Sequence, residues 1–90
     1  MPRYVVQRTF AEGLEIVATR DGARRCLDVV ATNAVYGVTW VHSYITVDGA
    51  LSYCIYEGPS AGAIRRAAGA SGLPVDRVTE VRVLDPYFHH

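Results

Sequence analysis

The chain has few cysteines, and Cys26 and Cys54 are the only two in its 90 residues. They are too few and too far apart in sequence to form a zinc knuckle or a Cys-x-x-Cys redox motif, so both kinds of site are excluded. Reduced thiols are the default in the cytoplasm, and we expect both cysteines to be free there.

The chain also lacks a net charge and a long apolar segment. Nine basic and nine acidic residues leave a formal net charge of zero, so there is no electrostatic footprint for nucleic acid or an anionic membrane. No apolar run approaches the roughly 20 residues of a membrane span, and the first residues lack the apolar core of a signal peptide. We therefore expect a cytoplasmic protein that binds neither nucleic acid nor membrane.

Recognisable catalytic patterns are missing as well. The sequence shows no paired carboxylates, no Ser-His-Asp arrangement and no Gly-rich phosphate loop. It shows no repeats, low-complexity tracts or internal linker either, which predicts one domain spanning residues 1–90. A binding protein is therefore favoured over an enzyme.

The pattern of the chain predicts the element order βαββαβ. Apolar residues at helical spacing predict a first helix from about Asp21 to Gly37, and Ser60 is a candidate N-cap for a second helix over 61–71. Strands are predicted over 4–10, 40–56 as a hairpin, and 78–84, with an irregular connection over 11–20. The predicted buried stripe of the first helix comprises Ala23, Cys26, Leu27, Val30 and Ala34.

This order is that of the ferredoxin-like α+β sandwich, in which two helices cover one face of a four-stranded antiparallel sheet. The other face would expose Trp40, Tyr44 and Tyr56, an aromatic surface larger than a soluble monomer usually leaves bare. We therefore expect a homodimer formed through the open sheet face, with a ligand cavity between the two sheets.

The hairpin carries most of the chemically versatile side chains, and two registers are possible around Asp48-Gly49. With a two-residue loop His42 faces Ile55, so His42 and Cys54 lie on opposite faces of the sheet. With a three-residue loop and a bulge at Gly49, His42 faces Cys54 at a Cβ distance of about 5 Å. We favour the bulged register because it separates aliphatic from polar side chains better.

The favoured register predicts a metal site. Imidazole nitrogen and thiolate sulfur suit Ni²⁺, Zn²⁺ or Cu²⁺, so His42 and Cys54 are candidate ligands and Tyr56 a candidate oxygen donor. The cavity around them would be lined by Trp40, Tyr44, Glu80 and Gln7. Two alternatives remain open: a small dimeric α+β barrel enzyme or binder of an organic ligand, with His42 as general acid or base, and an interaction module without a ligand.

Several of these motifs resemble one known family. The runs Trp40–Tyr44 and Tyr53–Tyr56, together with motifs that continue to Asp85-Pro86, are similar to the DUF4242 family of small actinobacterial nickel-binding proteins. The resemblance covers nearly the whole chain and implies a ferredoxin-like homodimer that binds nickel. The chain departs from the family at Gln7, where relatives tend to have Glu, and at Ala67, where they tend to have His. Each departure removes a possible metal ligand.

The last two residues, His89 and His90, form a histidine pair. Such a pair binds nickel independently of how the rest of the chain folds. Nickel bound there would not bear on the hairpin site.

Overall fold

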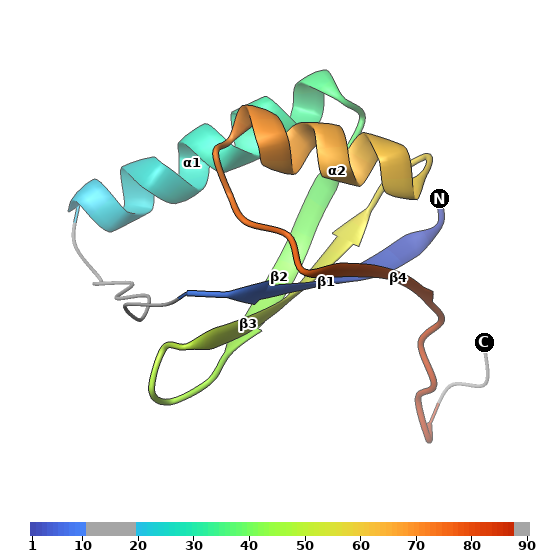
Figure 1. Cartoon of the computed structure of the whole chain (residues 1–90). Helices are drawn as coiled ribbons and strands as arrows, with labels where there is room; N and C mark the ends of the chain where they lie inside the picture. The colour runs from blue at the N-terminus through green and yellow to red at the C-terminus, as the bar shows by residue number, and fades with distance from the viewer. Residues whose placement is uncertain (11–19, 88–90) are drawn as a thin grey trace.

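The computed structural model of the chain describes residues 1–10 and 20–87, and the side chains of 20–23 are not described (Figure 1). The predicted connection over 11–20, apart from residue 20, and the pair His89 and His90 lie outside the described residues. In chain order the elements are β1 (Arg3–Thr9), α1 (Arg20–Val35), β2 (Thr39–Ile45), β3 (Leu51–Glu57), α2 (Ala61–Ala70) and β4 (Arg77–Val81). In the described ranges no helix has the length and apolar character needed to cross a membrane.

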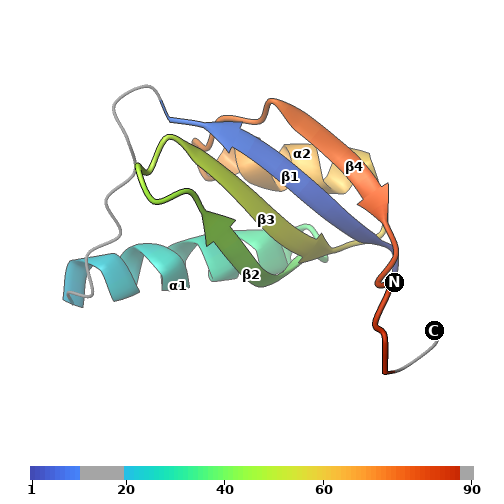
Figure 2. The same cartoon turned by 90° about the horizontal axis from the view of Figure 1, so that it is seen from below.

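The four strands form one antiparallel sheet in the order β2-β3-β1-β4. Both helices lie on the same side of it, above the sheet in Figure 1, and Figure 2 shows the sheet from the side without helices. This arrangement confirms the predicted ferredoxin-like α+β fold. It leaves one uncovered surface, which we call the open face.

The core lies between the sheet and α2. Side chains alternate along β1, so Tyr4 and Val6 point toward the helices. The apolar face of α2 packs over the same side of the sheet, and Ile64 on it is fully buried. The predicted cap at Ser60 is confirmed, since its Oγ accepts a hydrogen bond from the Ala63 backbone N–H at 3.1 Å. The remaining core residues are Val38, Cys54, Tyr56, Ala63 and Ala67.

Helix α1 ends where the sequence predicts, because Gly37 adopts a φ of 70° just beyond it. The predicted buried stripe is wrong at three positions, however: Leu27, Val30 and Ala34 are exposed, and Leu27 is 68% exposed, while the side chain of Ala23 lies outside those described. The face turned inward contains the buried Asn33 and the partly buried Cys26, Val29 and Tyr36. Both stripes satisfy helical spacing, so the period alone could not choose between them.

The hairpin adopts the register that we did not favour. His42 faces Ile55 and Ser43 faces Cys54, and the extra residue sits at Val41 in β2 rather than at Gly49. A one-residue shift of this kind exchanges the side chains of a strand between faces. His42 therefore lies on the open face and Cys54 on the helix-facing side.

Hydrogen bonds of the loop explain why the hairpin has no bulge at Gly49. Asp48 Oδ1 accepts hydrogen bonds from the Ala50 backbone N–H at 2.9 Å and from the Thr46 hydroxyl at 2.7 Å. The Thr46 hydroxyl also accepts from the Leu51 N–H at 3.0 Å, while the Thr46 backbone N–H donates to the Leu51 carbonyl at 2.9 Å. These bonds pair Thr46 with Leu51, which leaves residues 47–50 as the loop.

Candidate functional site

The open face is built from alternate residues of the four strands. Tyr44 is the most exposed aromatic side chain on it, at 65%, and lies opposite Tyr53. The apolar centre of this face comes from Val5, Tyr53 and Ile55, which are only partly covered within the chain. This composition corrects our prediction: Tyr56 is buried under the helices, and Trp40, which pairs with it, packs against the core.

Among the residues that the structure describes, His42 is the only histidine. It is exposed on the open face, in the outer strand β2. Its ring meets the Tyr44 ring edge-on, with centroids 5.2 Å apart and planes at 84°. Within residues 1–10 and 20–87, no group of three His, Cys, Asp or Glu side chains is placed to hold a metal ion. His42 can thus offer one imidazole ligand, and a complete shell needs further donors.

The other predicted ligands lie on the opposite side of the sheet. Cys54 and Tyr56 are both buried among the core residues, where the Cys54 Sγ is 3.6 Å from the Ser52 Oγ. The predicted set of His42, Cys54 and Tyr56 is therefore not brought together, because the observed register separates His42 from the other two. A metal ion cannot bridge these groups without crossing the sheet.

A buried arginine, which sequence reasoning missed, occupies the inner layer. Arg8 is 2% exposed, its Nη1 donates to the Tyr56 hydroxyl at 3.4 Å, and its Cζ lies 5.6 Å from the centre of that ring. Burial raises the pKa of Tyr56 above its ordinary 10.0, and the Arg8 charge opposes part of that shift. This cation also disfavours a metal ion at Cys54 or Tyr56. Strict alternation with Tyr4 and Val6 was the signal that could have placed Arg8 inside.

The two departures from the resembled family lie on opposite sides of the sheet. Gln7 pairs with Tyr53 and Arg77 on the open face, whereas Ala67 is fully buried in the core on the inner side of α2. They cannot therefore have removed two ligands of one site within a single chain. Of the two positions, only 7 shares a face with His42.

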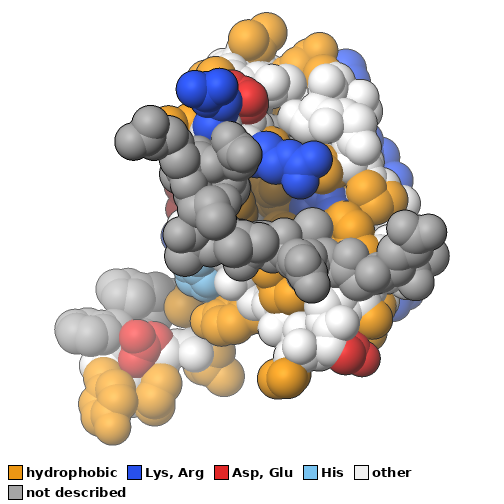
Figure 3. All heavy atoms as spheres, turned by 90° about the vertical axis from the view of Figure 1, so that its left-hand side faces the viewer, with side chains coloured by type: hydrophobic (Ala, Val, Ile, Leu, Met, Phe, Trp, Pro, Cys, Tyr) orange, Lys and Arg blue, Asp and Glu red, His pale blue; other side chains and the backbone are white. Residues whose placement is uncertain are grey.

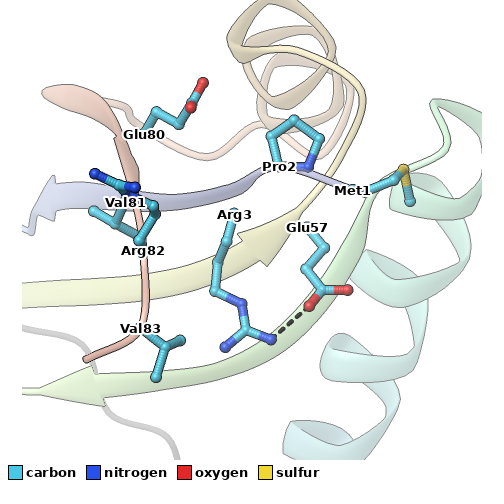
Figure 4. Close-up of a pocket in the computed structure, with 8 residues that line it drawn as sticks. All are labelled: Met1, Pro2, Arg3, Glu57, Glu80, Val81, Arg82 and Val83. Atoms are coloured by element: carbon cyan, nitrogen blue, oxygen red, sulfur yellow. Dashed lines mark hydrogen bonds and ion pairs between the residues drawn. The ribbon is translucent and has the colours of Figure 1, made fainter. Parts of the chain in front are cut away.

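Glu80 lies on the helix side of the sheet, so it does not line a cavity on the open face as predicted. It pairs with Tyr4 and is exposed at the β4 edge, where it lines an open groove of about 380 Å³ (Figure 4). Across that groove Arg3 Nη2 forms an ion pair with Glu57 Oε1 at 2.5 Å, and this hydrogen bond and charge lower the pKa of Glu57 below its ordinary 4.5. The groove mixes charges of both signs with apolar side chains, so it shows no preference for an anion or a cation. Its other lining residues are Met1, Pro2, Val81, Arg82 and Val83.

The chain matches one family model and one solved structure. A model of the family described as nickel responsive protein, SCO4226-like, matches residues 4–81. The crystal structure of SCO4226 from Streptomyces coelicolor A3(2) matches with a TM-score of 0.74 and 21% sequence identity, covering 92% of this chain and 99% of that one, and this likeness shows a common fold. No curated protein matches the chain significantly. Since the family model spans most of its length, the chain belongs to the SCO4226-like family of nickel responsive proteins.

Proposed function

We propose that this protein is a cytoplasmic nickel-binding homodimer, assembled through its open face, without catalytic activity of its own. The family match over residues 4–81 is the observation that carries the proposal. A nickel responsive family is compatible with metal binding, and the motifs that resemble DUF4242 proteins support the same function. The two cysteines are free, as expected for a cytoplasmic protein.

The assembly follows from the uncovered sheet. Val5 and Ile55 are covered by neither helix, and two tyrosines next to them extend the apolar surface. Pairing two such faces would remove this surface from water, which is the main favourable term in association. A second copy of the chain has the same face to offer, and a two-fold arrangement closes the assembly at two copies.

The metal site of this proposal contains His42. Imidazole nitrogen is a ligand that nickel accepts, and zinc and copper accept it too, so selectivity would come from geometry and supply. The described residues of one chain contribute a single imidazole and no group of three ligands. We therefore place the ion where the open faces of two protomers meet, with the second copy and water completing the shell.

Native mass spectrometry with nickel titration tests the proposal. The protein should end at Phe88, which removes His89 and His90, and zinc and copper should be titrated in parallel. We expect a fixed number of nickel ions per dimer and an affinity that falls at least tenfold in His42→Ala, because one ligand is lost.

The matched control is Cys54→Ser, which changes a buried side chain on the other side of the sheet. It should leave nickel binding unchanged. Binding that survives in His42→Ala but is lost in Cys54→Ser would contradict the proposed site, and a dimer that takes up no metal would contradict the function.

One observation favours a second candidate. Tyr44 and Tyr53 lie opposite each other on the open face, and both are exposed. Such a pair suits stacking against an aromatic organic molecule between two sheets. Metal-free dimers that bind such a molecule, and lose it in Tyr44→Ala, would favour this reading.

A further inference from the structure

The segment that follows β4, residues 82–87, leaves the sheet because it has no strand to pair with; we call it the C-terminal arm. The β1–β4 pairing ends at Arg3 and Val81, where β1 itself begins. The preceding residue, Pro2, has no N–H to offer, and its carbonyl already accepts a hydrogen bond from Gly58 at 3.1 Å. The sequence predicts a strand as far as Leu84, but β4 stops at Val81 for this reason.

The arm carries exposed apolar side chains besides the charged residues Arg82 and Asp85. Leu84 is 90% exposed, Tyr87 is 86% exposed and Val83 is 48% exposed. Its shape is stabilised by a turn in which Asp85 Oδ1 accepts a hydrogen bond from the Tyr87 backbone N–H at 2.8 Å. In Figure 3 the arm stands apart from the body at the lower left, with hydrophobic side chains on its surface.

The arm lies on the side of the sheet that the helices leave uncovered. Figure 1 shows it descending below the sheet, and Figure 2 shows it beyond the end of the strands, so it does not cover the open face of its own chain. At its root lies the groove of Figure 4, which Val83 lines together with the Arg3–Glu57 ion pair. The nearest part of its own sheet is therefore a groove in which charged and apolar side chains alternate with no continuous apolar surface.

Its length suits the open face of another copy. Residues 82–87 span at most about 20 Å when extended, at roughly 3.3 Å per residue. Four strands about 4.8 Å apart make a sheet about 14 Å wide between its outer strands. An arm that starts at the end of one sheet can thus reach across a second sheet stacked against it.

We propose that the C-terminal arm of each protomer docks on the open face of a second copy, with Leu84 and Val83 against the apolar centre formed by Val5, Tyr53 and Ile55. This inference rests on the homodimer of the proposed function and adds the contact that closes it. The family match ends at residue 81, so the arm lies outside the part that the family model describes. In this arrangement the arm of each protomer covers the open face of the other, so both exposed apolar surfaces are removed from water.

Sedimentation equilibrium over a concentration series tests the arm. Leu84→Asp changes a side chain that is almost fully exposed in the single chain, so the fold should be unaffected, as circular dichroism would check. We expect the dimer dissociation constant to rise at least about tenfold, since a charge replaces a leucine that is buried in both symmetric copies of the contact. The control is Leu27→Asp on α1, also an exposed leucine but on the other side of the sheet, which should leave the constant unchanged.

A third variant separates this inference from the homodimer itself. If Tyr53→Asp dissociates the dimer and Leu84→Asp does not, the open face is the interface but the arm is not part of it. If Leu27→Asp weakens the dimer as much as Leu84→Asp, the arm has no special role and the inference is overturned. A wild-type chain that is monomeric throughout the series would overturn the homodimer and the arm exchange together.

Discussion

Gly58, which links β3 to α2, sits where an added methyl group would touch the core. A Cβ at this position would lie 3.1 Å from Ile64 Cδ1 and 3.2 Å from Val38 Cγ2, both closer than ordinary contact. The backbone does not forbid alanine, because Gly58 is not among the glycines with positive φ. We expect Gly58→Ala to lower the free energy of unfolding by about 1–3 kcal/mol through overpacking.

The nearest atom can be removed without touching Gly58. Ile64→Val deletes Cδ1 and alone should cost about 0.5–1.5 kcal/mol. In that background the new Cβ keeps the close contact with Val38 Cγ2 and an ordinary one, 3.7 Å, with Cγ1 of residue 64. The cost of Gly58→Ala should therefore fall, and the cycle should yield a coupling energy of about 1 kcal/mol.

Urea unfolding followed by the fluorescence of Trp40, the single tryptophan, measures these differences at a fixed protein concentration. With an m-value of about 1 kcal/mol/M, a loss of 1 kcal/mol moves the midpoint by about 1 M. The control is Gly69→Ala in α2, where the added Cβ would meet nothing within 4 Å. This substitution should stabilise α2 by up to about 1 kcal/mol, because alanine favours a helix more than glycine does. An equal loss for Gly58→Ala in both backgrounds would refute the packing argument.

Three further predictions concern charge and pH. Hydrogen bonds from the Ala50 N–H and the Thr46 hydroxyl hold the pKa of Asp48 below its ordinary 3.8. The stability that the Asp48 carboxylate contributes is therefore present above that pH and is lost as the pH falls below it. Asp48→Asn should flatten the acid side of the profile of stability against pH, measured by urea titrations. Burial raises the pKa of Tyr56 above 10.0, so stability should fall as the pH rises beyond that value, and Tyr56→Phe should remove part of this alkaline slope. Within the part of the chain that the structure describes, the Nε of the buried Arg8 has no hydrogen-bond partner. Arg8→Met should therefore leave the free energy of unfolding unchanged or raise it by up to about 4 kcal/mol, whereas Arg8→Ala should lower it. A loss above about 2 kcal/mol for Arg8→Met would show that the guanidinium is well paired.

Local chemistry made the helix ends and the element order predictable. Ser60 caps α2 and Gly37 ends α1 as expected, since each effect depends on one residue and its immediate neighbours. The length of β4 was not predictable in the same way. Val81 and Val83 continue the strand alternation, but β4 stops at Val81 because β1 provides no further partner.

The candidate site was harder to predict because it depends on which face of the hairpin is buried. We assumed that the aliphatic set would face the helices, yet the inner layer holds Ser52, Cys54 and Arg8. The hydrogen bonds that pair Thr46 with Leu51 overrode the polarity pattern and fixed the register. His42 lies on the open face as predicted, whereas Cys54 and Tyr56, predicted on the same face, are buried under the helices.

The bulge at Val41 has a consequence for how copies of this chain can associate. β2 is an outer strand, and an unbroken outer strand presents a row of free N–H and C=O groups to which another chain can add. The extra residue interrupts that row, and the opposite outer strand, β4, covers only Arg77–Val81 and carries charged side chains. Side-by-side extension of the sheet into filaments is thereby discouraged at both edges.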